Sequence, residues 1–298
     1  MRDRFPLELG PLRQLTILSL DAPLVALAWQ QLYATAWEVV LEWTTLLVLF
    51  LSVWLGYAAD RWLDGFTDTR PDAHHDLYRA HRQPVLWLWL VLLATTVATA
   101  LVFLPSHALC RGWWLLGAVL LYTLFAQLAR GWRRYGAVKS VAISLLVWTG
   151  TWIFALPPAP AGTVGVPSAV WEVSPQRAPG VVGGPDIPGA TTVLVAMLVP
   201  IPLFALNCAL IDSWAAERAG KGAGAAAVIA TAIALLADGI AWSYTTALPA
   251  WRLFPEAALA SCALLWGLHL ARRFLHPAPR RTLADVCLMS PFATAALA

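Results

Sequence analysis

The chain contains 298 residues, of which 59% are hydrophobic and 12% charged, and its mean hydropathy is +0.66. A soluble domain needs more charge to cover its surface, so this composition excludes a soluble globular protein and indicates an integral membrane protein in contact with the lipid bilayer. The formal net charge is +3, and no basic patch is interleaved with aromatic residues, so the sequence predicts no nucleic-acid partner.

Nine apolar segments follow one another along the chain. About 20 apolar residues cross the hydrocarbon core of a bilayer as a helix, so the predicted fold is all-α, a polytopic membrane bundle. No small-residue cleavage pattern follows the first segment, so we expect it to be a retained span and not a removed signal peptide. The nine predicted spans are residues 15–34, 43–62, 84–104, 112–130, 138–156, 191–214, 223–244, 256–275 and 282–297.

The Lys and Arg residues are distributed unevenly between the predicted loops. The N-terminal segment and the even-numbered loops hold 17 of the 20, and the odd-numbered loops hold only Arg111, Arg177 and Arg252. Cytoplasmic loops carry such an excess of positive charge, so the sequence predicts a cytoplasmic N-terminus, and we expect the protein in a bacterial inner membrane. A wrong number of spans would scramble the asymmetry, so the charge pattern also supports the count of nine.

A stretch rich in Pro and Gly, residues 157–190, separates the fifth predicted span from the sixth. It is nearly uncharged and too interrupted for a helix, so we expect an external loop, either a cap over the outer mouth or a plain connector. This loop divides a single transmembrane domain into two halves that we expect to be similar, residues 1–156 and 191–298. In the sixth span, Pro200 and Pro202 should kink or break the helix near its middle.

Asp60 and Asp64 lie where the second predicted span ends. Residues four apart on a helix share a face, so the two carboxylates form an acidic edge at the cytoplasmic rim of the membrane. Hard cations such as Mg²⁺ prefer carboxylate oxygen, and the pair is therefore a candidate metal site. The alternative is a solvated polar helix end at which Asp64 pairs with Arg61.

Asp212 and Glu217 lie at the end of the sixth predicted span, on the same predicted face of the membrane. Two acidic helix ends on one face can hold Mg²⁺ between them, and Mg²⁺ in turn binds diphosphate. The offset of five residues places Glu217 about 140° around the helix from Asp212. Glu217 can therefore reach the same ion only if the helix ends or unwinds there.

Two further acids fall inside apolar segments. Asp238 lies toward the outer end of the seventh predicted span, and Asp21 precedes Pro23 in the first. An ionisable residue inside a membrane segment suggests a functional site. A local hydrogen bond at a helix end would satisfy such a residue as well, and Asp21 has the position of a helix cap.

The acidic segments resemble the signature motifs of the UbiA superfamily of intramembrane prenyltransferases. These proteins have nine transmembrane helices, with an NDxxDxxxD-type motif at the end of the second and a DxxxD-type motif at the end of the sixth. Asp60, Arg61 and Asp64 match the first motif. Gly56 and Tyr57 stand where the Asn and the first Asp are expected.

The second motif is matched in part. Asp212 corresponds to its leading Asp and Gly220 to its trailing Gly. Ala216 replaces the second Asp, and Glu217 follows one place later. A third likeness is the segment Tyr135–Lys139, which is similar to the YxxxK segment before the fifth helix of the family. The resemblance covers the topology of the whole chain and three short motifs.

The resemblance implies a Mg²⁺-dependent prenyltransferase. In this family Mg²⁺ bridges the aspartates to an allylic isoprenyl diphosphate, and a lipophilic or aromatic acceptor captures the carbocation after the diphosphate leaves. The implied metal ligands are Asp60, Asp64, Asp212 and Glu217. The implied diphosphate-binding residues are Arg61, Lys139 and Arg218. The implied catalytic residues are Lys139, Arg61 and Tyr135. The missing carboxylate in each motif favours one metal ion over two.

Three other functions fit the same pattern. A membrane terpene cyclase of the same superfamily would ionise the diphosphate without an acceptor. A non-enzymatic relative, such as a scaffold or lipid-binding protein, would have kept the fold after losing the ligands replaced by Gly56, Tyr57 and Ala216. A secondary transporter would explain two halves and a broken sixth span, but it needs an ionisable site near the bilayer midplane, whereas these acids lie at the rim.

Overall fold

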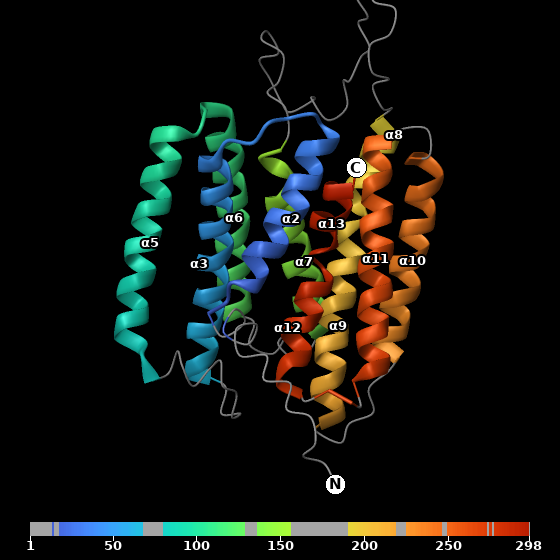
Figure 1. The fold of residues 1–298 in the computed structure, drawn as a ribbon. Helices are drawn as coiled ribbons and strands as arrows, with labels where there is room; N and C mark the ends of the chain where they lie inside the picture. Colours follow the sequence, from blue (N-terminus) through green and yellow to red (C-terminus); the bar gives the residue numbers. More distant parts are fainter. Residues whose placement is uncertain are drawn as a thin grey trace, which may run out of the picture.

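The structure is a computed structural model of an all-helical bundle, and the described residues contain no strand. It describes residues 14, 18–67, 80–128, 136–155, 190–218, 225–245, 249–272, 274–275 and 277–297. The long helices run up and down beside one another (Figure 1). The elements are α2 (Asp21–Ala36), α3 (Trp43–Thr67), α5 (Arg82–Phe103), α6 (Ser106–Leu128), α7 (Gly136–Ile153), α8 (Ala190–Leu198), α9 (Pro200–Arg218), α10 (Ala225–Thr245), α11 (Pro249–Ala271), α12 (Pro277–Cys287) and α13 (Ser290–Leu297).

Five described helices are long and apolar enough to cross a membrane, in agreement with the expectation of a membrane protein. Two more, α7 and α10, carry shorter apolar stretches, Val141–Ile153 and Ile229–Thr245. The full count of nine spans stays a prediction. The five candidate spans are Trp43–Trp62, Arg82–Phe103, Ser106–Phe125, Val193–Trp214 and Ala250–Ala271.

The sixth predicted span is broken at its prolines, as expected. Helix α8 ends at Leu198 and α9 begins at Pro200, a residue that suits the first position of a helix because it has no N–H to donate. The break leaves the carbonyl oxygen of Met197 open to side chains from two other helices. Tyr33 Oη of α2 donates to it at 3.0 Å, and Trp148 Nε1 of α7 donates to it as well.

The last predicted span, residues 282–297, is divided into α12 and α13. Pro291 has no N–H to donate to the carbonyl oxygen of Cys287 four residues earlier, so the helix cannot continue unchanged. Ser261 Oγ of α11 donates to that oxygen at 2.8 Å instead, and Trp29 Nε1 of α2 donates to the carbonyl oxygen of Leu288 at 3.1 Å. Side chains thus replace the donors that the helix loses.

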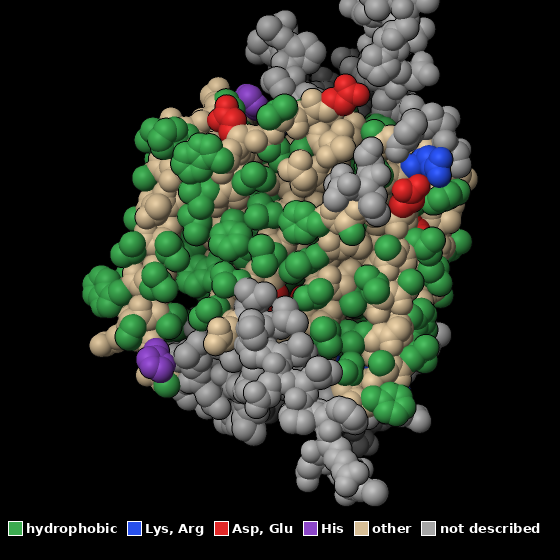
Figure 2. Space-filling model, viewed as in Figure 1, with side chains coloured by type: hydrophobic (Ala, Val, Ile, Leu, Met, Phe, Trp, Pro, Cys, Tyr) green, Lys and Arg blue, Asp and Glu red, His purple; other side chains and the backbone are tan. Residues whose placement is uncertain are grey.

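The main core lies among α2, α8, α9, α11 and the C-terminal helices, and Trp29, Tyr33 and Phe254 are fully buried in it. Helices α5 and α6 lie at the edge of the bundle, where α5 packs against α3 and α6 against α7. Their outer faces carry large exposed side chains such as Trp87 and Trp114. Figure 2 shows hydrophobic side chains over the middle of one face, with His side chains near its two ends. This distribution suits a surface in contact with lipid.

Candidate functional site

The two helices that carry the predicted acidic motifs end on the same side of the bundle (Figure 1). Asp60 is partly buried near the C-terminal end of α3, and the neighbouring Arg61 is 5% exposed. Asp212 lies near the C-terminal end of α9, with its side chain exposed. The chain therefore brings the two motif-bearing helix ends to one rim, while Asp212 faces outward from α9.

The predicted metal ligands are described only in part. Within the described residues, no three His, Cys, Asp or Glu side chains come close enough to hold a metal ion. The predicted residues whose side chains lie outside the described part are Asp64, Tyr135, Lys139, Glu217 and Arg218. The four-carboxylate site therefore stays a prediction.

A small cavity lies deeper in the bundle than the acidic rim. It has a volume of about 40 Å³, which is room for a few water molecules. Part of its wall consists of apolar side chains of α2, α7 and α9. Its polar lining consists of Tyr57 from α3, Ser144 from α7, Asn207 and Cys208 from α9, and Asp285 from α12. We call these five residues together with Asp21 and Arg281 the polar cluster.

Asp285 is at the centre of the polar cluster. Asn207 Nδ2 donates to Asp285 Oδ1 at 2.9 Å, which joins α9 to α12. The carboxyl of Asp21 and the guanidinium of Arg281, one turn earlier on α12, lie near enough to Asp285 to interact with it electrostatically. Asp21 is 2% exposed, and its Oδ1 accepts the Ala22 N–H at 3.0 Å. Asp21 is the first residue of α2 and not its cap, which is Leu20, so the cap expected at Asp21 is wrong.

Helix α12 packs against α2, α9 and α11, so the Asp285 carboxyl is enclosed by helices on several sides.

Two buried oxygen atoms of the polar cluster lack a donor among the described residues. No N–H or O–H donates to Asp21 Oδ2 or to Asn207 Oδ1. Asn207 is 6% exposed and lines the cavity, so its amide oxygen is an acceptor beside the small space. Because buried acceptors are nearly always satisfied, a water molecule or a small ligand is expected there.

The sequence singles out Asp21 and Tyr57 but gives them other roles, and it passes over Asn207 and Asp285. The signal that was available is the occurrence of Asn207 within the apolar run of α9 and of Asp285 within the last predicted span. Neither residue has a motif around it. Their meeting depends on the packing of α2, α9 and α12, which periodicity does not reveal.

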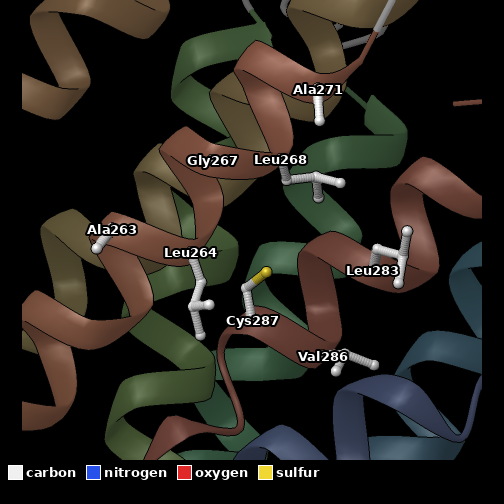
Figure 3. Close-up of a pocket in the computed structure, with 8 residues that line it drawn as sticks. All are labelled: Ala263, Leu264, Gly267, Leu268, Ala271, Leu283, Val286 and Cys287. Atoms are coloured by element: carbon white, nitrogen blue, oxygen red, sulfur yellow. The ribbon is translucent and has the colours of Figure 1, made fainter. Parts of the chain in front are cut away.

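A second, more open recess lies elsewhere, between α11 and α12, and Figure 3 shows its lining. It has a volume of about 390 Å³ and is lined by small and apolar residues, among them Gly267, Leu268 and Val286. Among the described residues, its lining contains no charged side chain that could orient a diphosphate and none of the predicted site residues.

No family model, curated protein or solved structure matches the chain.

Proposed function

We propose that the protein is a Mg²⁺-dependent intramembrane prenyltransferase of the UbiA type, which transfers an isoprenyl group from an allylic diphosphate to a lipophilic or aromatic acceptor. The observation that supports this proposal best is the convergence of α3 and α9. Their motif-bearing ends lie on one side of the bundle, and Tyr57 and Asn207, about one turn farther in, line the same cavity. The resemblance requires two acidic helix ends that share one space.

The proposed roles follow from the chemistry of the side chains. Asp60, Asp64 and Asp212 would supply hard oxygen ligands to Mg²⁺, joined by Glu217 if α9 unwinds at its end. Mg²⁺ would neutralise the leaving diphosphate. Basic side chains would hold the diphosphate, and the apolar interior would keep water away from the carbocation. The proposed diphosphate-binding and catalytic residues are Arg61, Lys139, Arg218 and Tyr135.

A non-enzymatic relative is the second candidate, and the cavity supports it. A space of about 40 Å³ holds a few water molecules and no isoprenyl chain, so an enzyme would have to open its helices to admit substrate. The exposure of the Asp212 side chain likewise favours the non-enzymatic candidate. A lipid-binding or scaffold protein needs neither a chamber nor a complete set of carboxylates.

The two candidates are separated by turnover of the diphosphate. Protein purified in lipid nanodiscs is incubated with geranyl, farnesyl and geranylgeranyl diphosphates, with and without Mg²⁺, and released diphosphate is measured. We expect Mg²⁺-dependent release that falls at least about 100-fold in Asp60→Asn, because a metal ligand acts directly on the transition state. Glu42→Gln changes an exposed acid just before the opposite end of α3 and should leave release unchanged.

Each contrary result has a clear meaning. If none of the three diphosphates is turned over, or if Asp60→Asn and Asp64→Asn both turn over at the wild-type rate, the enzymatic proposal fails. Products distinguish the members of the superfamily, because a terpene cyclase yields a cyclised hydrocarbon or alcohol from the diphosphate alone. Transfer requires a second substrate.

A further inference from the structure

The recess between α11 and α12 (Figure 3) opens on the outside of the bundle. Its α11 wall runs from Ala263 to Ala271 at the end of a candidate membrane span, and its described lining is small and apolar throughout. The side chains at its edges face outward, because Leu264 on α11 is 53% exposed and Val286 on α12 is 37% exposed. A volume of about 390 Å³ is within the range of small-molecule sites.

Gly267, in the middle of the α11 wall, borders space that the described part of the chain does not fill. A Cβ atom placed on it would meet no neighbouring atom within 4 Å. The glycine is therefore not required for the close approach of another described helix. An open space loses dispersion contacts unless something outside the chain occupies it, and beside a membrane helix that space is filled by lipid.

Positive charge gathers at one end of the recess. The sequence from residue 272 to residue 283, which joins α11 to α12 and begins α12, contains four Arg residues and no Asp or Glu. Arg272 directly follows Ala271, and Arg280 lies three residues before Leu283 on the same face of α12. Ala271 and Leu283 both line the recess, so the basic segment begins where the apolar lining ends.

Hydrogen bonds hold two of these guanidinium groups close to the joining segment. Arg272 Nη1 donates to the carbonyl oxygen of His269 at 2.7 Å, and Arg280 Nη2 donates to the carbonyl oxygen of Leu275 at 2.8 Å. Their positive charges therefore stay at the end of the recess and do not extend away from the bundle.

The recess has the length of one leaflet of a bilayer. The wall from Ala263 to Ala271 extends about 12 Å along the helix, and one leaflet contributes about 15 Å of hydrocarbon. The basic end lies on the side of the bundle where α3 and α9 also end (Figure 1), which is the side that the loop charges predict to be cytoplasmic. The cytoplasmic leaflet is the one that carries anionic lipid.

We propose that the α11–α12 recess binds an anionic phospholipid of the leaflet in which it lies, with one acyl chain along Gly267 and the headgroup phosphate at Arg272 and Arg280. The apolar lining suits the chain, and the planar guanidinium group matches the geometry of phosphate. A second copy of the protein suits the recess less well, because a two-fold axis along the membrane normal would bring two arginine-rich segments together. The proposal does not depend on prenyl transfer.

The test is native mass spectrometry of protein released from nanodiscs that contain equal amounts of phosphatidylcholine and phosphatidylglycerol. We expect wild-type protein to retain phosphatidylglycerol and Gly267→Leu to lose it, because the new side chain occupies the recess. Gly117→Leu is the matched control and should retain the lipid. It makes the same change at an exposed glycine of α6 whose added Cβ also meets no atom within 4 Å.

The role of the arginines is tested by Arg280→Gln, which keeps an N–H donor for the Leu275 carbonyl oxygen but removes the charge. The preference for phosphatidylglycerol over phosphatidylcholine should fall about fivefold, the effect expected for one Arg beside an anionic surface. Arg252→Gln removes a charge near the opposite end of α11, where Arg252 pairs with Glu256 at 3.3 Å, and should leave the preference unchanged.

A measurement on the wild-type protein covers the case in which a variant does not fold. Phosphatidylglycerol with a photoreactive diazirine on its acyl chain is added to the nanodiscs, and the crosslinked residues are mapped. We expect crosslinks in α11 and α12 between Ala263 and Cys287, which excess phosphatidylglycerol suppresses and excess phosphatidylcholine does not.

Several results would overturn the proposal. Equal retention of phosphatidylglycerol by wild-type protein and Gly267→Leu would show that the lipid lies elsewhere. Equal retention of the two lipids by wild-type protein would show that the arginines select no headgroup. A dimer that Gly267→Leu converts to a monomer would assign the recess to a second copy. Crosslinks spread evenly over the outer faces of α5, α6 and α11 would show contact with bulk lipid only.

Discussion

The carboxyl group of Asp285 accepts the Asn207 amide at 2.9 Å and lies near Asp21, so three helices meet at a single side chain. No element of this arrangement is visible in the sequence around residue 285. Asp60 and Asp64 were identifiable because their spacing has a meaning within one helix. Asp21, Asn207 and Asp285 share no helix, and their relation arises only when the chain has folded.

At the level of the helices, the break between α8 and α9 is the feature that the sequence predicted best. Prolines act through their own missing N–H, which is a local property. The division of the last segment has the same cause at Pro291, but a single proline in a short segment is a weaker signal. What no local rule supplies is the origin of the replacement donors, which come from α2, α7 and α11.

The shared acceptor at the α8–α9 break predicts a specific non-additivity. Met197 O receives both Tyr33 Oη and Trp148 Nε1. Removing one donor leaves the carbonyl oxygen satisfied, so Tyr33→Phe and Trp148→Phe should each lose little stability from the hydrogen bond itself. The double variant leaves a buried acceptor unpaired, which is disfavoured by about 1–3 kcal/mol.

A double-mutant cycle on the unfolding free energy gives the coupling directly. The loss in the double variant should exceed the sum of the two single losses. Thr35→Ala, which removes another side-chain donor on α2, provides a comparison because its hydroxyl bonds only within the helix. Simple additivity between Tyr33 and Trp148 would mean that the two donors act on separate acceptors.

Helix α5 offers a test of lipid exposure. Val91 is near the middle of its candidate span and is 60% exposed, on a face of α5 that no other described helix covers. An Arg there would meet hydrocarbon, so Val91→Arg should disfavour insertion of the segment by about 2.5–3.5 kcal/mol on the translocon scale. Insertion assays on the isolated segment measure this change, and Val91→Leu should have no effect.

For the whole molecule, the loop charges predicted which helix ends lie together, and Figure 1 has the ends of α3 and α9 on one side. Helix positions were accessible because a long apolar run is a strong signal by itself. The packing order of the helices could not be predicted in this way, because helices that alternate in direction can be arranged around a centre in several ways. The predicted rim site and the observed polar cluster differ for this reason.

The predicted orientation can be tested with engineered cysteines in a background without native cysteines. Ser106 begins α6 and Ala80 precedes α5, both with exposed side chains, and the basic-residue pattern predicts opposite membrane faces for them. A membrane-impermeant maleimide added to intact cells should label Ser106→Cys and should label Ala80→Cys only after permeabilisation. Labelling in the reverse order would invert the topology.

The indole of Trp29 and the carbonyl of Leu288 are 259 residues apart in sequence and 3.1 Å apart in space, so the first described long helix is closed against the last two. This has a consequence for biosynthesis. Synthesis proceeds from the N-terminus, so α2 is made before α12, and Asp21 lacks the side chains of α12 until that helix has followed. A chain truncated before α12 would therefore expose a buried acid to lipid and to the proteases that remove unassembled membrane segments. Completion of α12 and α13 is therefore the step that protects a newly made copy from these proteases.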